Sequence, residues 1–126
     1  MAQTPQQVPD NTPVLVGVGV ATQREEDWSR AKEPLALMLE ATHAAAADSG
    51  APTLLTALDL VAVPHGRWRY QNAGGAIARA VGAGGAQSLF ASVGVLQQTL
   101  IGEACARIAR GEAKAALVVG GECGYR

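Results

Sequence analysis

Short apolar runs alternate along this chain with segments of helical periodicity, and this alternation is the feature that most constrains the fold. The predicted strands are residues 14–20, 58–63, 86–91 and 115–119. The predicted helices between them are residues 32–49, 73–81 and 96–110. Strands that alternate with helices over short connections are joined by right-handed crossovers. The sequence therefore predicts an α/β domain, a parallel sheet with helices on both faces.

Start and stop signals fix the ends of the predicted helices. Pro34 suits the first turn of the first helix, and Gly50 ends it. Asn72 is predicted to be the N-cap of the second helix, which Gly82 ends, and Gly111 ends the third. The β-branched run of residues 14–20 is typical of a strand buried on both faces.

The predicted order across the sheet is third, second, first and fourth strand. The first two helices are then expected on one face and the third helix on the other. In such sheets, sites lie beyond the carboxyl ends of the strands. The candidates at this edge are His65, Ser92, Gly94 and Gly121.

Length and charge exclude several classes of function. With 126 residues the chain suits one domain, on a prior of roughly 100–200 residues per domain. We expect a flexible tail over residues 1–13 and the folded domain over residues 14–126. A formal net charge of −1 with no run of like charge argues against nucleic acid or an anionic membrane as a partner. No apolar run approaches the ~20 residues of a membrane span, and no signal peptide is evident, so we expect a cytoplasmic protein.

The two cysteines have no CxxC spacing, so neither a disulfide framework nor a zinc site is predicted. Cys105 falls on the apolar stripe of the third helix and is expected to be a small buried hydrophobe. Cys123 follows the fourth strand near the expected site edge. A reactive thiol there has no basic neighbour, apart from Arg126, to lower its pKa.

Two glycine-containing motifs admit a functional and a structural interpretation. Gly17 and Gly19, followed by Thr22, match most of the dinucleotide fingerprint GxGxxG, but a polar loop separates them from the next helix. Close packing against a neighbouring helix is the alternative. Ser92 and Gly94 form half of a nucleophile elbow, yet no histidine follows them. A helix N-cap is the alternative function for Ser92.

The histidines differ in interest. His43 is expected on the solvated side of the first helix. His65 opens a loop in which Arg67 and Arg69 flank Trp68. The two arginines suit a phosphate-bearing ligand or a partner subunit. Alternatively, Trp68 simply covers the edge of the sheet.

Several stretches together resemble the thiolase superfamily, and most of all the acetyl-CoA acetyltransferase-like proteins of the sterol-carrier-protein thiolase branch. They are residues 12–19, 68–72, 102–104, 108–113 and 118–122. The resemblance implies the first part of a thiolase-type N-terminal domain, acyltransferase chemistry on CoA thioesters in lipid metabolism, and a dimer. It also implies a catalytic cysteine at the start of the third helix, where a helix N-terminus favours a thiolate.

The sequence departs from that family at the chemistry. Gly94 stands where the resemblance places the cysteine, and the family's remaining catalytic groups belong to a C-terminal half. Residues 71–75 also depart from the family pattern, Gln-Asn-Pro-Ala-Arg. No catalytic residue, metal site or tightly bound cofactor is therefore predicted, and a CoA thioester is the possible substrate. The chain is either part of an acyltransferase or an aldolase-type CoA-thioester lyase, or a non-catalytic interaction domain.

A partner is predicted from the third helix and the third strand. Leu100, Ile101 and Ile108 are expected to face the sheet, leaving a stripe of small residues at Gly102, Ala106 and Ala109 for another helix. The third strand has no Lys or Pro to guard an open edge. We expect a second copy, or a missing C-terminal thiolase half, at these two surfaces.

Overall fold

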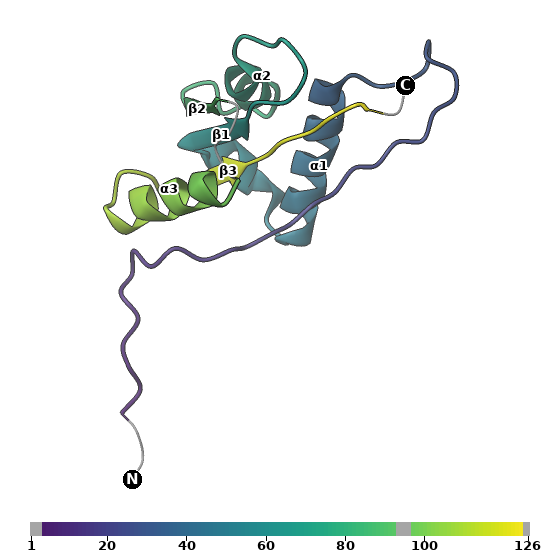
Figure 1. Cartoon of the computed structure of the whole chain (residues 1–126). Helices are drawn as coiled ribbons and strands as arrows, with labels where there is room; N and C mark the ends of the chain where they lie inside the picture. Colours follow the sequence, from purple (N-terminus) through teal and green to yellow (C-terminus); the bar gives the residue numbers. More distant parts are fainter. Residues whose placement is uncertain (1–3, 93–96, 125–126) are drawn as a thin grey trace.

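Three of the four predicted strands form one parallel sheet in the computed structural model, which describes residues 4–92 and 97–124. They are β1 (Leu60–Pro64), β2 (Gln87–Ala91) and β3 (Ala116–Val118), in the order β2-β1-β3 (Figure 1). Leu60 pairs with Gln87 on one side and with Ala116 on the other. The central strand is therefore the second apolar run of the sequence.

The three predicted helices form close to their expected bounds. They are α1 (Pro34–Asp48), α2 (Ala73–Ala80) and α3 (Gln97–Ala109), with a short 3-10 helix η1 (Pro52–Ala57) that was not predicted. Asn72 caps α2, since its side-chain oxygen accepts a hydrogen bond of 2.9 Å from the Gly75 N–H. The predicted helix stops Gly50, Gly82 and Gly111 all have positive φ, which is why glycine stands at these positions.

Helices cover both faces of the sheet, as predicted. On one face α1 and α2 enclose the larger core, in which Met38, Val61, Val63 and Ile77 are all fully buried. On the other face α3 packs against β1 and β3, and Leu100 meets Ala62 and Ala91. Side chains of β1 alternate between these two clusters, so this strand supplies the centre of the fold.

The predicted strand over residues 14–20 does not form, and this prediction was wrong. The segment is extended but pairs with no strand, and it runs past α1 as a separate line of chain (Figure 1). Gly17 and Gly19 lie directly on the α1 backbone, where a Cβ would overlap the carbonyl oxygens of Ala45 and Ala41. The glycines therefore serve close packing on a helix, as the structural interpretation held, but not as part of a sheet.

The predicted strand order was also wrong. The first predicted strand was expected between the strands now labelled β1 and β3, which instead pair directly. Hydrogen bonds extend the β1–β3 pairing at both of its ends. The Asp59 N–H donates to Ala115 O at 2.9 Å, and the Val119 N–H donates to Ala62 O at 3.0 Å. The Asp59 carboxylate also accepts the Lys114 N–H at 2.7 Å, which fixes where β3 begins.

Candidate functional site

An open pocket of ≈ 300 Å³ lies where β1 and β3 end and α3 begins. Its lining consists of Pro64, Val118, Val119 and Gly120 from the strand ends, and Gln97 and Ile101 from α3, and polar and apolar atoms share its surface about equally. This is the carboxyl edge of the parallel sheet, where ligands bind in α/β folds. The Gln97 amide is the polar side chain of the lining.

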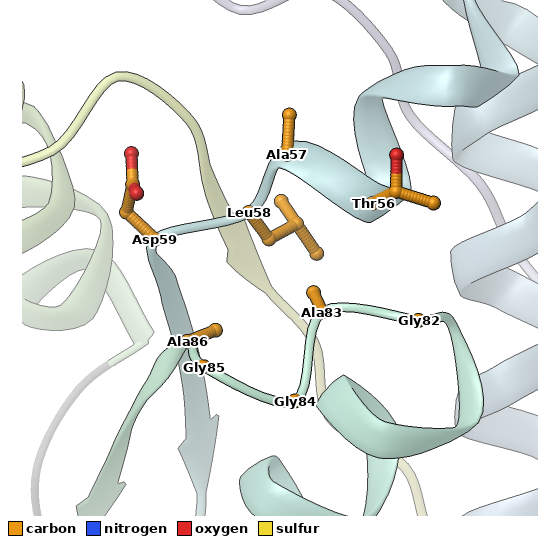
Figure 2. A pocket seen from close by; sticks show the side chains of 9 residues that line it. All are labelled: Thr56, Ala57, Leu58, Asp59, Gly82, Ala83, Gly84, Gly85 and Ala86. Atoms are coloured by element: carbon orange, nitrogen blue, oxygen red, sulfur yellow. The ribbon is translucent and has the colours of Figure 1, made fainter.

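A second pocket, of ≈ 320 Å³, lies at the opposite, amino edge of the sheet (Figure 2). Small residues of the 82–86 turn and of η1 line it, and Asp59 is its one ionisable residue. Because the Asp59 carboxylate already accepts the N–H groups of Lys114 and Ala115, it has a structural role. The amino-edge pocket therefore offers no group for chemistry.

The loop after β1 is held by Trp68. Its indole is 8% exposed, packs in the larger core, and donates a hydrogen bond of 2.8 Å to the Gly121 carbonyl oxygen. A His65 ring nitrogen, Nε2, lies 3.2 Å from the Trp68 carbonyl oxygen. The buried Trp68 side chain therefore joins the loop after β1 to the chain after β3.

Aromatic rings continue outward from Trp68. The ring of His65 meets Trp68 and Phe90 edge-on, with centroids 5.4 Å and 5.0 Å apart, and Tyr70 lies 5.0 Å from Trp68. The backbone N–H of Arg67 donates to a Glu122 carboxylate oxygen at 2.6 Å. These contacts join the loop after β1 to the chain after β3.

The structure places the candidate residues unequally. Hydrogen bonds through Trp68 bring together His65, which is exposed, and Gly121, which is half-buried. Ser92 is exposed directly after β2 and shares no hydrogen bond with them in the described chain. Gly94 lies outside the described residues, as does the position that would cap α3.

The other residues that the sequence singled out also differ in how far they are buried. Cys105 is half-buried on α3, and the Sγ of Cys123 lies 3.0 Å from the Lys32 carbonyl oxygen. His43 is exposed on α1, as expected. Ile101 was predicted to face the sheet but is 51% exposed and borders the carboxyl-edge pocket. Leu100, which was also predicted to face the sheet, is buried as expected, and Ala104 is buried one turn further along the helix.

Hydrogen bonds shift the pKa of three exposed groups away from the sheet edge. A hydrogen bond from Ser29 lowers the pKa of Asp27 in the loop before α1. Just after the C-terminal end of α3, Arg110 donates a hydrogen bond to Glu112. This hydrogen bond raises the pKa of Arg110 and lowers that of Glu112. Across residues 4–92 and 97–124, no three His, Cys, Asp or Glu side chains gather where they could hold a metal ion.

Sequence reasoning missed Gln97 and the site-lining role of Ile101. A strand end is readable from the sequence, but which turn of α3 meets it depends on the tilt of the helix. Glu122 directly follows the Gly120-Gly121 pair after β3, so the sequence already places it at the carboxyl edge of the sheet. The distant Arg67 N–H that it accepts was not readable from that position.

Comparison with known proteins places this arrangement in a fold class. No family model and no curated protein sequence matches the chain. Among solved structures, the chain is similar to a monomeric SCP2-thiolase-like protein type 1 from Mycobacterium smegmatis, with 33% identity and a TM-score of 0.70. It is also similar in fold to the priming β-ketosynthase of a polyketide pathway, with 20% identity and a TM-score of 0.65.

These matches cover 94% and 93% of this chain, but only 25% and 44% of the two neighbours. The chain therefore has a thiolase-type fold. The chain spans about a quarter of the length of the SCP2-thiolase-like protein that it resembles. No helix within the described residues is both long and apolar enough to traverse a lipid bilayer.

Proposed function

We propose that this chain belongs to a thiolase-like protein that binds acyl-CoA thioesters, and that it provides part of the binding edge without the acyl-transfer nucleophile. The observation that carries the proposal is the pocket between the first turns of α3 and the ends of β1 and β3, at the carboxyl edge of the sheet. Pro64, Ile101 and Val118 offer an acyl group an apolar surface, and the Gln97 amide offers a hydrogen bond to a carbonyl oxygen.

The missing nucleophile supports a non-catalytic role for the chain taken alone. A thiolase-type acyl transfer requires a thiolate that forms the thioester with the enzyme. Neither cysteine belongs to the pocket lining, and glycine at position 94 has no side chain to acylate. We therefore expect no acyl-enzyme intermediate and no cleavage of acetoacetyl-CoA by this chain.

Partners and setting are part of the same proposal. A C-terminal thiolase half or a second copy would complete the fold, through the open edge of β2 and the exposed side of α3. The exposure of Gly102 and Ala109, and the half-exposed Ala106, supports this use of α3. Cys105 and Cys123 form no disulfide, which suits a reduced, cytoplasmic setting.

Two measurements on the intact chain test the proposal. Calorimetric titration with acetyl-CoA is expected to show binding that weakens when Ile101→Trp fills the pocket. Thr99→Trp is the matched control, since Thr99 is exposed on the same helix and does not line the pocket. Absence of binding, or equal weakening by both substitutions, would refute acyl-CoA binding at this edge.

Intact-mass spectrometry after exposure to acetoacetyl-CoA tests the missing chemistry. The expected result is an unmodified chain. Turnover that needs an added thiol acceptor and survives replacement of both Cys105 and Cys123 would overturn this account of the chemistry. Turnover that is lost on replacing Cys123 alone would identify that residue as the nucleophile.

A further inference from the structure

The loop that follows β1 carries two arginines on either side of a buried tryptophan. Arg67 and Arg69 are exposed, and neither forms an ion pair within residues 4–92 and 97–124. Trp68 between them packs in the larger core, so the backbone that carries the two guanidinium groups is held by that core. A guanidinium group presents its N–H donors as a planar fork that matches two oxygens of a phosphate. The pair therefore suits a ligand with more than one phosphate group.

Two acidic side chains reach the same loop, and each accepts a hydrogen bond from it. A Glu122 carboxylate oxygen accepts the main-chain N–H of Arg67 at 2.6 Å. The Tyr70 hydroxyl donates to a Glu33 carboxylate oxygen at 3.4 Å. Because these bonds come from a backbone amide and a phenol, they leave the guanidinium groups of Arg67 and Arg69 available to an anion from solvent.

Aromatic rings lie beside the arginines at the same edge of the sheet. The ring of His65 is exposed, and Phe90 on the neighbouring strand β2 is 38% exposed. Their centroids are 5.0 Å apart, and the Phe90 centroid is 5.9 Å from that of Trp68. An exposed aromatic ring offers a surface on which a nucleobase stacks. Guanidinium groups beside such rings are the two kinds of contact that a nucleotide requires.

This loop is continuous with the carboxyl-edge pocket at two points. Pro64 lines the pocket and His65 follows it directly, and Gly120 lines the pocket next to Gly121, which accepts the Trp68 indole N–H. The pocket volume of ≈ 300 Å³ lies at the lower end of the roughly 300–1,000 Å³ of ligand sites. It therefore suits an acyl group and leaves the nucleotide of a CoA thioester outside. A flexible pantetheine arm can cross the sheet edge from the α3 face to the loop.

We propose that Arg67 and Arg69 bind the phosphate groups of an adenine nucleotide whose base packs against Phe90 and His65. The nucleotide is the charged end of a CoA thioester, an assignment that rests on the proposed function of the carboxyl-edge pocket. Because both arginines are exposed, their attraction for phosphate is screened by salt. The affinity for the nucleotide therefore falls as the ionic strength rises.

Calorimetric titration of the full chain with ADP tests the phosphate contacts apart from the acyl pocket. The double variant Arg67→Gln/Arg69→Gln is expected to weaken ADP binding about tenfold or more, because charge-assisted hydrogen bonds are lost. Arg79→Gln/Lys114→Gln is the matched control. It removes the same charge from two exposed residues that also form no ion pair within the described chain. Absence of ADP binding, or equal weakening by both double variants, overturns the proposal.

Inorganic diphosphate separates the phosphate contacts from the contact with the base. Phe90→Leu is expected to weaken ADP binding about fivefold, because the base loses an aromatic ring on which to stack. Binding of diphosphate to the same variant should be unchanged, which also shows that the loop keeps its conformation. Equal weakening of ADP and diphosphate binding by Phe90→Leu would contradict a contact between this ring and the base.

A thioester without a nucleotide distinguishes this inference from the proposed function. Arg67→Gln/Arg69→Gln should weaken the binding of acetyl-CoA and leave that of S-acetylpantetheine unchanged, whereas Ile101→Trp should weaken both. ADP binding through the arginines without any binding of S-acetylpantetheine would remove the proposed function and retain the phosphate site. Acetyl-CoA binding that is the same with and without the two arginines would remove the phosphate site and retain the pocket.

Discussion

Two valine-rich runs of this chain have similar sequences and opposite environments. In β1, Leu60, Val61 and Val63 are at most 1% exposed, whereas Leu15 in the run of residues 14–20 is 84% exposed. Both runs are extended. The difference teaches that a β-branched run only becomes a buried strand when neighbours occupy both its edges and both its faces.

The neighbours of β1 can be counted from its contacts. β2 and β3 pair with its two edges, α2 packs on one face and α3 on the other. Residues 14–20 have α1 on one side and no strand at all. Glycine and valine alternate along this segment, and this alternation explains how the segment lies on α1. Gly17 and Gly19 face the helix, while the valines at even positions face away from it.

The largest expected effect separates the two runs by one matched substitution. Leu60→Ala is expected to lower the free energy of unfolding by about 2–5 kcal/mol, because it leaves a cavity in the centre of the sheet. Leu15→Ala should change it by less than about 0.5 kcal/mol, as for an exposed side chain. Urea unfolding followed by circular dichroism, at a concentration where the chain is monomeric, measures both.

Equal losses for the two leucines would break the comparison. A large loss for Leu15→Ala would mean that residues 14–20 are buried in solution.

Much of the fold could be predicted from local signals. Helix ends were readable because Pro34, Asn72 and the three stop glycines act through backbone geometry within one turn. The two-sided placement of the helices followed from right-handed crossovers. The order of the strands could not be predicted, because it depends on which of two similar valine-rich runs pairs with β3.

The candidate site was predicted less completely than the fold. Strand ends are local signals, so His65 and Gly121 were readable as the residues that follow two strands, but neither lines the carboxyl-edge pocket. Ile101 was assigned to the wrong face, since Leu100 and Ile101 are adjacent and a small rotation of α3 exchanges their roles. The Arg67–Glu122 hydrogen bond joins residues far apart in the sequence, and no local pattern signals it.

A second, smaller effect compares the loops that follow the two runs, each of which contains a tryptophan. Trp68→Phe is expected to cost about 1–3 kcal/mol of unfolding free energy, because the Gly121 carbonyl oxygen loses its indole donor. Trp28→Phe is the matched control, since Trp28 is 78% exposed. Trp28→Phe should leave the free energy of unfolding unchanged. The remaining fluorescence then comes from Trp68 and should be that of a buried indole.

The fluorescence makes this test sensitive to the loop itself. Trp68→Phe leaves only Trp28, whose emission is expected at the wavelength of a solvated indole in both the folded and unfolded chain. If Trp28→Phe destabilises the chain as much as Trp68→Phe, the loop after residues 14–20 is packed, and the contrast between the two runs does not extend to their loops.

The smallest global effect concerns the attachment of residues 14–20 to α1. In Gly19→Ala the new Cβ overlaps the Ala41 carbonyl oxygen, so the segment must move away from the helix. The core lies elsewhere, and the unfolding free energy should fall by about 1 kcal/mol or less.

Gly102→Ala is the control, because a Cβ added at Gly102 has no neighbour within 4 Å outside its own helix. Removing a glycine from the interior of α3 should raise stability by about 0.5–1 kcal/mol. Hydrogen exchange provides the local readout: the Val18 amide, bonded to Asp48, should exchange faster in Gly19→Ala and unchanged in Gly102→Ala. An unchanged Val18 amide in Gly19→Ala would show that α1 does not hold the segment, and that the contacts which orient its valines lie on another surface.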